Sequence, residues 1–154
     1  MPNHWLFKSE PGAYSWDDLV RDRVAEWDGV RNFTARNLLR DEIKTGDLVL
    51  FYHSNAKPPA VVAIAEVVRD GYPDHTAWDP ASDHPDPKST PAKPRWYMVD
   101  IVPREKLARE VSLDEVKTVP ELSDMVLLRQ GRLSVQPVRP AEFETIVRMA
   151  GTPR

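Results

Sequence analysis

Two apolar segments in the first half of the chain place the strongest constraint on its fold. LVLFYHS (48–54) and AVVAIAEVV (60–68) are rich in β-branched and aromatic residues, and Lys57-Pro58-Pro59 stands between them. Short apolar runs of this kind, bounded by turn residues, predict buried strands, and we expect 48–54 to be central. RWYMVDIV (95–102) alternates between apolar and polar residues, which indicates a half-buried neighbouring strand. These three strands are therefore predicted to form an antiparallel sheet.

Short helices and two further strands complete the predicted fold. Serine and asparagine favour helix N-caps, proline favours the first helical turn, and glycine favours the position after a helix ends. The predicted helices run from Ser15 to about Arg23, from Asn32 to about Asp41, from the capping-box pair Ser112 and Glu115, from Pro120, and from about Pro140 to Ala150 before Gly151. The remaining predicted strands are 5–8 and 133–138. This mixture predicts an α+β fold.

Composition limits the classes of function. The 154 residues are expected to form one domain, 1–154, and the absence of cysteine excludes disulfides, thiolate metal sites and a cysteine nucleophile. A chain without cysteine, signal peptide or long apolar segment is expected to be cytoplasmic, with no membrane partner, and we favour a monomer. The net charge of -3 argues against coating of nucleic acid through a general basic surface. A local basic patch remains compatible with that charge.

Motifs for catalysis and for cofactors are missing. His53 and Ser54 are adjacent on a predicted strand, so their side chains point to opposite faces and form no dyad. The chain contains no G-x-S-x-G elbow and no glycine-rich phosphate loop. We therefore predict no catalytic residue, no cofactor and no enzyme activity.

The segment Asp70–Pro94 is predicted to be a long proline-rich loop. Loops of this length in compact domains are commonly functional or disordered. We expect it to act as a lid, and we expect that 81–91 can be deleted without loss of the fold. Its acidic and histidine residues offer candidate metal ligands, but no helical ligand spacing joins them, so we assign no metal site. They are His75, Asp79, Asp83, His84 and Asp86.

The motif WDGVRN (27–32) raises a more specific question. Gly29 stands between an aromatic residue and an arginine, as though the backbone there must approach another group closely. The simpler interpretation is a turn glycine with positive φ, followed by Asn32 as the N-cap of a helix.

Several long segments, in order, resemble one known family. They are WLFKSEP, WDGVRNFTARNLL, LVLFYHS, AIAEVVRDGYPDHTAWDP, DPKSTPAKPRWYMVDI, and LSVQPV followed by a helix. Together they resemble the EVE domain, a family that includes the thymocyte nuclear protein 1 group and belongs to the PUA-like superfamily with the YTH and ASCH domains. The resemblance implies a PUA-like, strongly curved mixed β-barrel flanked by short helices.

The resemblance also implies a function. PUA-like domains bind nucleic acid, and YTH domains hold a modified base in a pocket, so the expected partner is modified DNA or RNA. Such a pocket needs an aromatic face, polar groups for the base edge and basic groups for the flanking phosphates. The residues expected to bind the ligand are Lys8, Ser9, Trp27, Gly29, Val30, Arg31, Asn32, Tyr52, His53, Ser54, Asn55, Trp78, Asp79, Lys88 and Arg95.

Within this set, Arg31 has the most specific expected role. Its planar guanidinium is expected to stack on or bond the base, so its removal should weaken binding with little loss of stability. A polar modification, such as a hydroxymethyl or carboxyl-bearing pyrimidine, is our hypothesis for the ligand.

Two other classes of function stay open. One is an enzyme that acts on a modified nucleotide or a small metabolite, with His53 and either Glu10 or Asp79 as acid and base. The other is a protein-interaction adaptor, which would present an exposed apolar patch.

Overall fold

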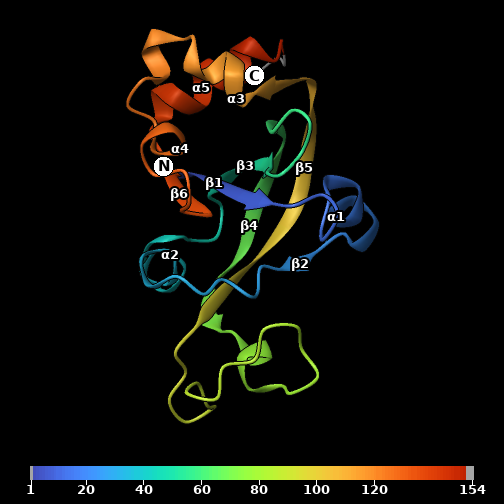
Figure 1. Ribbon diagram of the computed structural model, residues 1–154, viewed down its shortest axis with the longest axis vertical. Coiled ribbons are helices and arrows are strands. Elements are labelled where there is room, and N and C mark those ends of the chain that lie inside the picture. The colour runs from blue at the N-terminus through green and yellow to red at the C-terminus, as the bar shows by residue number, and fades with distance from the viewer. Residues whose placement is uncertain (1, 152–154) are drawn as a thin grey trace.

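The computed structural model describes residues 2–151 and contains a mixed six-stranded sheet with five α-helices around it (Figure 1). The strands are β1 (His4–Ser9), β2 (Ala25–Glu26), β3 (Leu48–His53), β4 (Ala60–Pro73), β5 (Tyr97–Ser112) and β6 (Val135–Val138). The α-helices are α1 (Trp16–Asp22), α2 (Phe33–Asn37), α3 (Leu113–Lys117), α4 (Val126–Arg129) and α5 (Pro140–Met149). Residues 2–151 also form a π-helical turn, η1 (Leu38–Glu42), and two 3-10 turns, η2 (His75–Trp78) and η3 (Pro120–Leu122). The predicted α+β class is confirmed.

The strands lie in the order β2-β5-β4-β3-β1-β6. β3, β4 and β5 are antiparallel neighbours, as the sequence predicted, whereas β1 runs parallel to β3. β2 and β6 are the two edges of the sheet, so within residues 2–151 the hydrogen-bonded sheet is open. The predicted closed barrel is therefore not confirmed.

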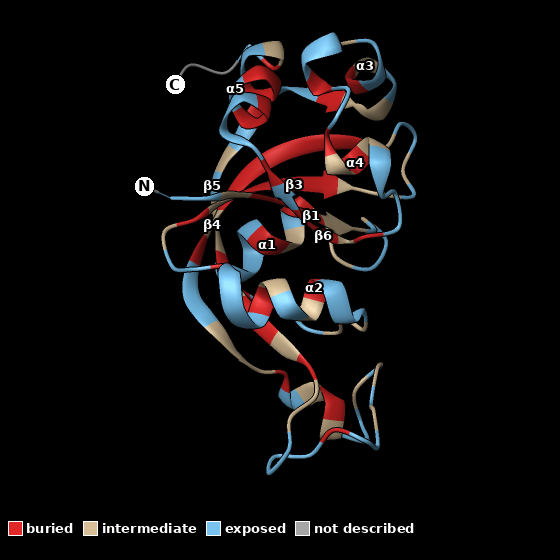
Figure 2. Ribbon diagram, turned by 90° about the vertical axis from the view of Figure 1, so that its left-hand side faces the viewer, coloured by how far each residue is buried: buried red, intermediate tan, exposed pale blue. Residues whose placement is uncertain are grey.

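Both faces of the central strands are buried. In β3, Val49 and Phe51 belong to one core cluster, whereas Leu50 and Tyr52 belong to a second cluster on the other face. Buried residues of α1 and α2 pack in the first cluster and those of α3, α4 and α5 in the second, so helices cover both faces (Figure 2). Burial on both faces explains why 48–54 reads as a continuous apolar run and confirms its central position.

β4 and β5 are longer than the sequence predicted. The predicted strand ends at residues 68 and 102 are wrong, because pairing continues from β4 to Pro73 and β5 extends to Ser112. The two strands form a long ribbon that carries the segment 74–96 away from the sheet (Figure 1). Asp70–Pro73 therefore belongs to a strand and His75–Trp78 to a 3-10 turn, in place of the first part of the predicted loop.

The predicted helix starts are confirmed where capping residues marked them. Ser15 and Asp18 form a capping box at α1, and Ser112 and Glu115 form one at α3. The Oδ1 atom of Asn32 accepts the N–H of Ala35 and caps α2. That helix was predicted to continue to about Asp41, but it passes into the π-helical turn η1. No helix within residues 2–151 has the length and apolar character needed to cross a membrane.

η1 also packs directly on the ribbon. A Cβ atom at Gly71 of β4 would lie 2.1 Å from the backbone oxygen of Leu39. Only glycine permits this approach, so the backbones of η1 and β4 are in contact here.

Candidate functional site

A cavity of about 830 Å³ lies beside the end of β1 and the segment that contains β2. Its walls come from the N-terminal part of the chain and from two segments that are distant from it in sequence. They are formed by residues 8–10, 13, 14, 22, 24–31, 83, 84 and 134. The volume is within the range of about 300–1,000 Å³ that is typical of small-ligand sites.

Gly29 answers the question raised by WDGVRN. Its φ is +77°, and a Cβ atom there would lie 2.8 Å from Cε1 of His84. The backbone N–H of Gly29 donates to Oδ2 of Asp74 at 2.8 Å. The Gly29 backbone therefore approaches the His84 ring and a buried carboxylate of the same chain. Gly29 also has the positive φ that the simpler interpretation, a turn glycine, predicted.

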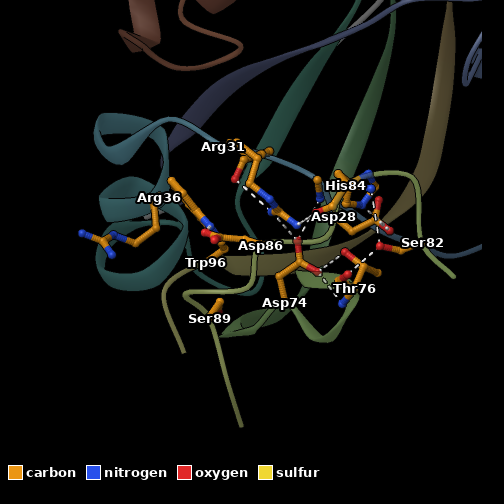
Figure 3. Close-up of polar contacts among 12 residues, drawn as sticks. Asp28, Arg31, Arg36, Asp74, Thr76, Ser82, His84, Asp86, Ser89 and Trp96 are labelled. Carbon is orange, nitrogen blue, oxygen red and sulfur yellow. Dashed lines mark hydrogen bonds and ion pairs between the residues drawn. The ribbon is translucent and has the colours of Figure 1, made fainter. Parts of the chain in front are cut away.

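Arg31 connects the segment 27–32 to the segment 74–96, which we call the distal segment (Figure 3). Its Nη1 donates to Oδ2 of Asp74 at 2.9 Å and its Nη2 donates to the carbonyl of His84 at 2.8 Å. The guanidinium also lies 5.5 Å from the centre of the Trp96 ring. Arg31 lines the cavity as predicted, but both of its terminal nitrogens already donate to groups of the same chain. In this structure the side chain therefore holds the segment 27–32 against Asp74 and His84.

Asp74 is the centre of this network and was missed by the sequence prediction. Its side chain is 0% exposed and accepts hydrogen bonds from Gly29, Arg31 and both the N–H and the hydroxyl of Thr76. Burial alone would raise the pKa of Asp74, but the hydrogen bonds from Thr76, Gly29 and Arg31 outweigh it and lower the pKa. The carboxylate is therefore held ionised. The only local sequence signal is a turn in which Asp precedes Thr by two positions.

Acidic side chains dominate the cavity wall. Carboxylates outnumber the two cations Lys8 and Arg31, and they are Glu10, Asp22, Glu26, Asp28 and Asp83. Burial raises the pKa of Asp28, and the neighbouring charges of Asp74 and Glu26 add to the effect. Nε2 of His84 lies 3.6 Å from Oδ2 of Asp28. The wall therefore offers hydrogen-bond acceptors and a negative potential.

Two aromatic rings contribute to the cavity. Trp27 lines it as predicted, but it is only 9% exposed and packs against Phe7 and Phe51, with ring centres 5.4 and 5.6 Å away. Tyr14 was not predicted. It lines the cavity, stands edge-on to Trp27 at 6.2 Å, and donates its hydroxyl to Oδ2 of Asp22 at 3.0 Å.

Lys8 and Ser9 also lie where the sequence placed them, at the end of β1 in the cavity wall. Nζ of Lys8 donates to the carbonyl of Gly131, and partial burial lowers the pKa of Lys8. The hydroxyl of Ser9 donates to the carbonyl of Tyr14. The residues predicted for the ligand site that do line the cavity are Lys8, Ser9, Trp27, Gly29, Val30 and Arg31.

The predicted far wall at the end of β3 does not reach the cavity. Tyr52 is buried in the second core cluster, where burial raises its pKa. Nε2 of His53 accepts the backbone N–H of Trp16, and burial lowers the pKa of His53. The N–H of Ser54 donates to the carbonyl of Ser9, and Asn55 has a positive φ of 51° in the turn that follows. These residues support the strand end from outside the cavity.

The remaining predicted residues also lie outside the cavity lining. Asn32 caps α2, and Trp78, Asp79 and Lys88 belong to the distal segment together with Arg95. The enzyme alternative paired His53 with Glu10 or Asp79, and of these three residues only Glu10 lines the cavity.

The distal segment is fixed by its own polar contacts. Oδ2 of Asp86 accepts Nε1 of Trp96 at 2.6 Å, and Oγ of Ser89 accepts the N–H of Arg95 at 2.9 Å. Deletion of 81–91 would remove these acceptors and His84, so these contacts do not support the expectation that the deletion leaves the fold intact. Among residues 2–151, no group of three or more acidic or histidine side chains is arranged to hold a metal ion.

Comparison with known proteins gives consistent matches. The sequence model described as the EVE domain matches residues 3–149. Thymocyte nuclear protein 1 of Mus musculus is 38% identical over 171 residues, which cover 99% of this chain and 75% of that protein. A hypothetical protein from Leishmania major superposes with a TM-score of 0.94 at 47% identity and covers 98% of this chain and 96% of its own.

A third match carries a ligand. The crystal structure of human THYN1 protein in complex with 5-methylcytosine-containing DNA superposes with a TM-score of 0.91 at 36% identity. The superposition covers 99% of this chain and 99% of that chain.

Proposed function

Because this chain belongs to the EVE domain family, we propose that it binds nucleic acid and holds a modified base in the cavity beside β1. The observation that carries the proposal is the structure of human THYN1 protein with 5-methylcytosine-containing DNA, which matches this chain over nearly its whole length. The proposed function is recognition without a catalytic step.

The cavity has the properties that a base reader needs. Its volume of about 830 Å³ suits a single base that has left its strand, and it is too small for a duplex. Tyr14 and Trp27 supply aromatic surface at the wall, and Gly29 allows a backbone segment to form the wall next to them. A base drawn out of a strand can be read there by its edge.

The charge of the wall narrows the class of base. Carboxylates accept hydrogen bonds from the exocyclic amino group of cytosine, and Asp28 is a carboxylate of the wall that lies beside His84. A base that carries its own carboxylate would share the cavity with the carboxylates of Asp28, Glu26 and Asp83. We therefore propose a neutral, amino-bearing pyrimidine of the 5-methylcytosine type in place of the carboxyl-bearing pyrimidine suggested from sequence.

The test compares oligonucleotides that differ in one base. Fluorescence anisotropy is measured with a labelled DNA strand that contains one cytosine, 5-methylcytosine or 5-carboxylcytosine, and with the 5-methylcytidine RNA of the same sequence. We expect 5-methylcytosine to bind tightest and 5-carboxylcytosine weakest. The DNA and RNA arms identify the natural class of strand.

A matched pair of variants locates the site. Asp28→Ala should abolish the preference for 5-methylcytosine, whereas Asp114→Ala, at an exposed position of α3, should leave it unchanged. Equal affinity of the wild-type protein for all three bases would refute the proposal. Retention of the preference in Asp28→Ala would refute the assignment of the cavity.

A further inference from the structure

An aromatic ring stands exposed at the start of α2, outside the cavity. Phe33 is 49% exposed, and one side of its ring stacks on Trp96 with ring centres 4.9 Å apart and planes 27° apart. Trp96 is itself only 5% exposed and is held by the 2.6 Å hydrogen bond from its Nε1 to Asp86. The Phe33 ring is therefore an exposed apolar surface on a fixed support.

Two arginines surround this ring. The guanidinium of Arg36 lies 4.9 Å and that of Arg95 lies 5.3 Å from the centre of Phe33. Arg36 donates to the side-chain oxygen of Asn37 and to the carbonyl of Arg95, which are both uncharged groups. Arg95 has a carboxylate, Asp86, at 3.5 Å. We call Phe33, Arg36, Arg95 and Trp96 the Phe33 patch, and it carries net positive charge on a protein whose total charge is -3.

The Phe33 patch adjoins the cavity through Arg31. Arg31 lines the cavity, and its guanidinium lies 5.5 Å from the centre of the Trp96 ring, which also contacts Phe33 and Arg95. In Figure 3, Arg36 and Trp96 lie to one side of Arg31, and Asp28 and His84 lie to the other. The acidic wall and the basic aromatic patch are thus separated by one side chain.

This arrangement separates the base of a bound nucleotide from the phosphates of its strand. An acidic cavity repels phosphates, so the backbone of a bound strand must stay outside it while one base enters. The surface next to the entrance then has to supply cations for the phosphates and an apolar face for an adjacent base. Arg36, Arg95 and the exposed face of Phe33 supply both.

We propose that the Phe33 patch binds the single nucleic-acid strand next to the base in the cavity, with Phe33 against a neighbouring base and Arg36 and Arg95 near its phosphates. This inference rests on the proposed function and adds a second contact surface to it. It assigns affinity for the strand to the patch and choice of the base to the cavity.

The test separates the strand from the base. Affinity is measured for a 5-methylcytosine-containing DNA strand, for its unmodified counterpart, and for the free nucleoside 5-methyldeoxycytidine. Phe33→Ala should weaken binding of both strands by about tenfold, because a base stacked on an aromatic ring contributes in this range. It should leave nucleoside binding and the ratio between the two strands unchanged, and Phe33→Tyr should restore strand binding.

Charge is tested in the same assay. Arg36→Gln should weaken strand binding and reduce the slope of log affinity against log salt by about one. Lys117→Gln on α3 and Val20→Ala on α1 serve as controls, because they remove an exposed cation and an exposed apolar side chain that are not part of the patch. Thermal unfolding of each variant shows whether its fold is intact.

The binding measurements on wild-type protein and variants distinguish the Phe33 patch from the proposed base reader. If the wild-type protein prefers the modified strand but Phe33→Ala and Arg36→Gln match their controls, the patch is refuted and the proposed function stands. If the wild-type protein binds strands without preference and Phe33→Ala weakens them, the base reader is refuted and the patch stands. Absence of binding to any strand refutes both, and a Phe33→Ala effect on self-association without one on strand binding refutes the patch.

Discussion

Replacement of Arg31 by alanine should destabilise the protein well beyond a surface change. The substitution removes the cation that faces Asp74, whose side chain is 0% exposed, and breaking a buried pair in this way costs about 3–5 kcal/mol. Asp74 keeps its hydrogen bonds from Gly29 and Thr76, so we expect the lower end, about 3 kcal/mol. For a chain of this length that corresponds to a fall in Tm of about 6–12 °C.

Differential scanning calorimetry measures this effect against a matched control. Arg129→Ala removes an exposed arginine whose partner is Asp124, where both side chains are more than 60% exposed, and should cost about 0–1 kcal/mol. In the double variant Arg31→Ala/Asp74→Asn no unpaired buried charge remains, so the two changes should be less than additive by about 1 kcal/mol or more.

The pH dependence has a definite sign. The folded pKa of Asp74 is lowered, so its contribution is complete above about pH 4 and is lost as the pH falls through the folded pKa. The difference between wild type and Arg31→Ala should shrink over the same acid range. A Tm loss for Arg31→Ala no larger than that for Arg129→Ala would refute the structural role of Arg31 and return it to the exposed, ligand-binding role expected from sequence.

Three further substitutions test other parts of the structure by thermal unfolding. Gly29→Ala should lower the free energy of unfolding by about 1–3 kcal/mol, because φ is positive at this position and the new Cβ would meet the His84 ring. Adding His84→Ala should restore part of that stability. An unchanged stability of Gly29→Ala would contradict the close approach. Asp28→Asn should raise Tm at pH 7, because burial raises the pKa of Asp28 and penalises its charged form. This gain in Tm should vanish as the pH falls toward about 4. A lower Tm of the variant at pH 7 would contradict the prediction. Gly71→Ala should lower the free energy of unfolding by about 3 kcal/mol or more, because its Cβ would lie 2.1 Å from a backbone oxygen. Gly131→Ala serves as the control, because a Cβ atom there meets nothing within 4 Å. Equal effects of the two substitutions would contradict the packing of η1 on β4.

The local signals in the sequence predicted the local structure. The apolar run 48–54 identified the central strand because both of its faces are buried, and Ser15, Asn32 and Ser112 identified helix starts because an N-cap acts on neighbouring backbone groups. The extension of β4 to Pro73 was missed because residues near the end of the ribbon are mostly exposed or partly exposed, so pairing with β5 leaves little apolar pattern there.

The site was predicted less completely because its walls meet only in the folded chain. The motif at 27–32 was identified correctly as a place of close backbone approach, but the group approached, His84, lies in another segment. Asp74 is 43 positions from Arg31, and nothing near either residue in the sequence reveals their pairing. Tyr14 reaches the cavity because α1 begins just after it, a position that no local pattern distinguishes from an ordinary exposed tyrosine.

The cavity wall also determines when during synthesis the site can exist. Lys8 lies near the beginning of the chain, and the carbonyl that it binds belongs to Gly131, 123 positions later. Ser134 contributes to the same wall, so a chain still emerging from the ribosome has no complete cavity until most of its residues have been made. Nascent chains and proteolytic fragments that end before Ser134 should therefore lack the complete cavity, and a binding assay on C-terminally truncated chains of increasing length should show no binding until the chain contains Ser134.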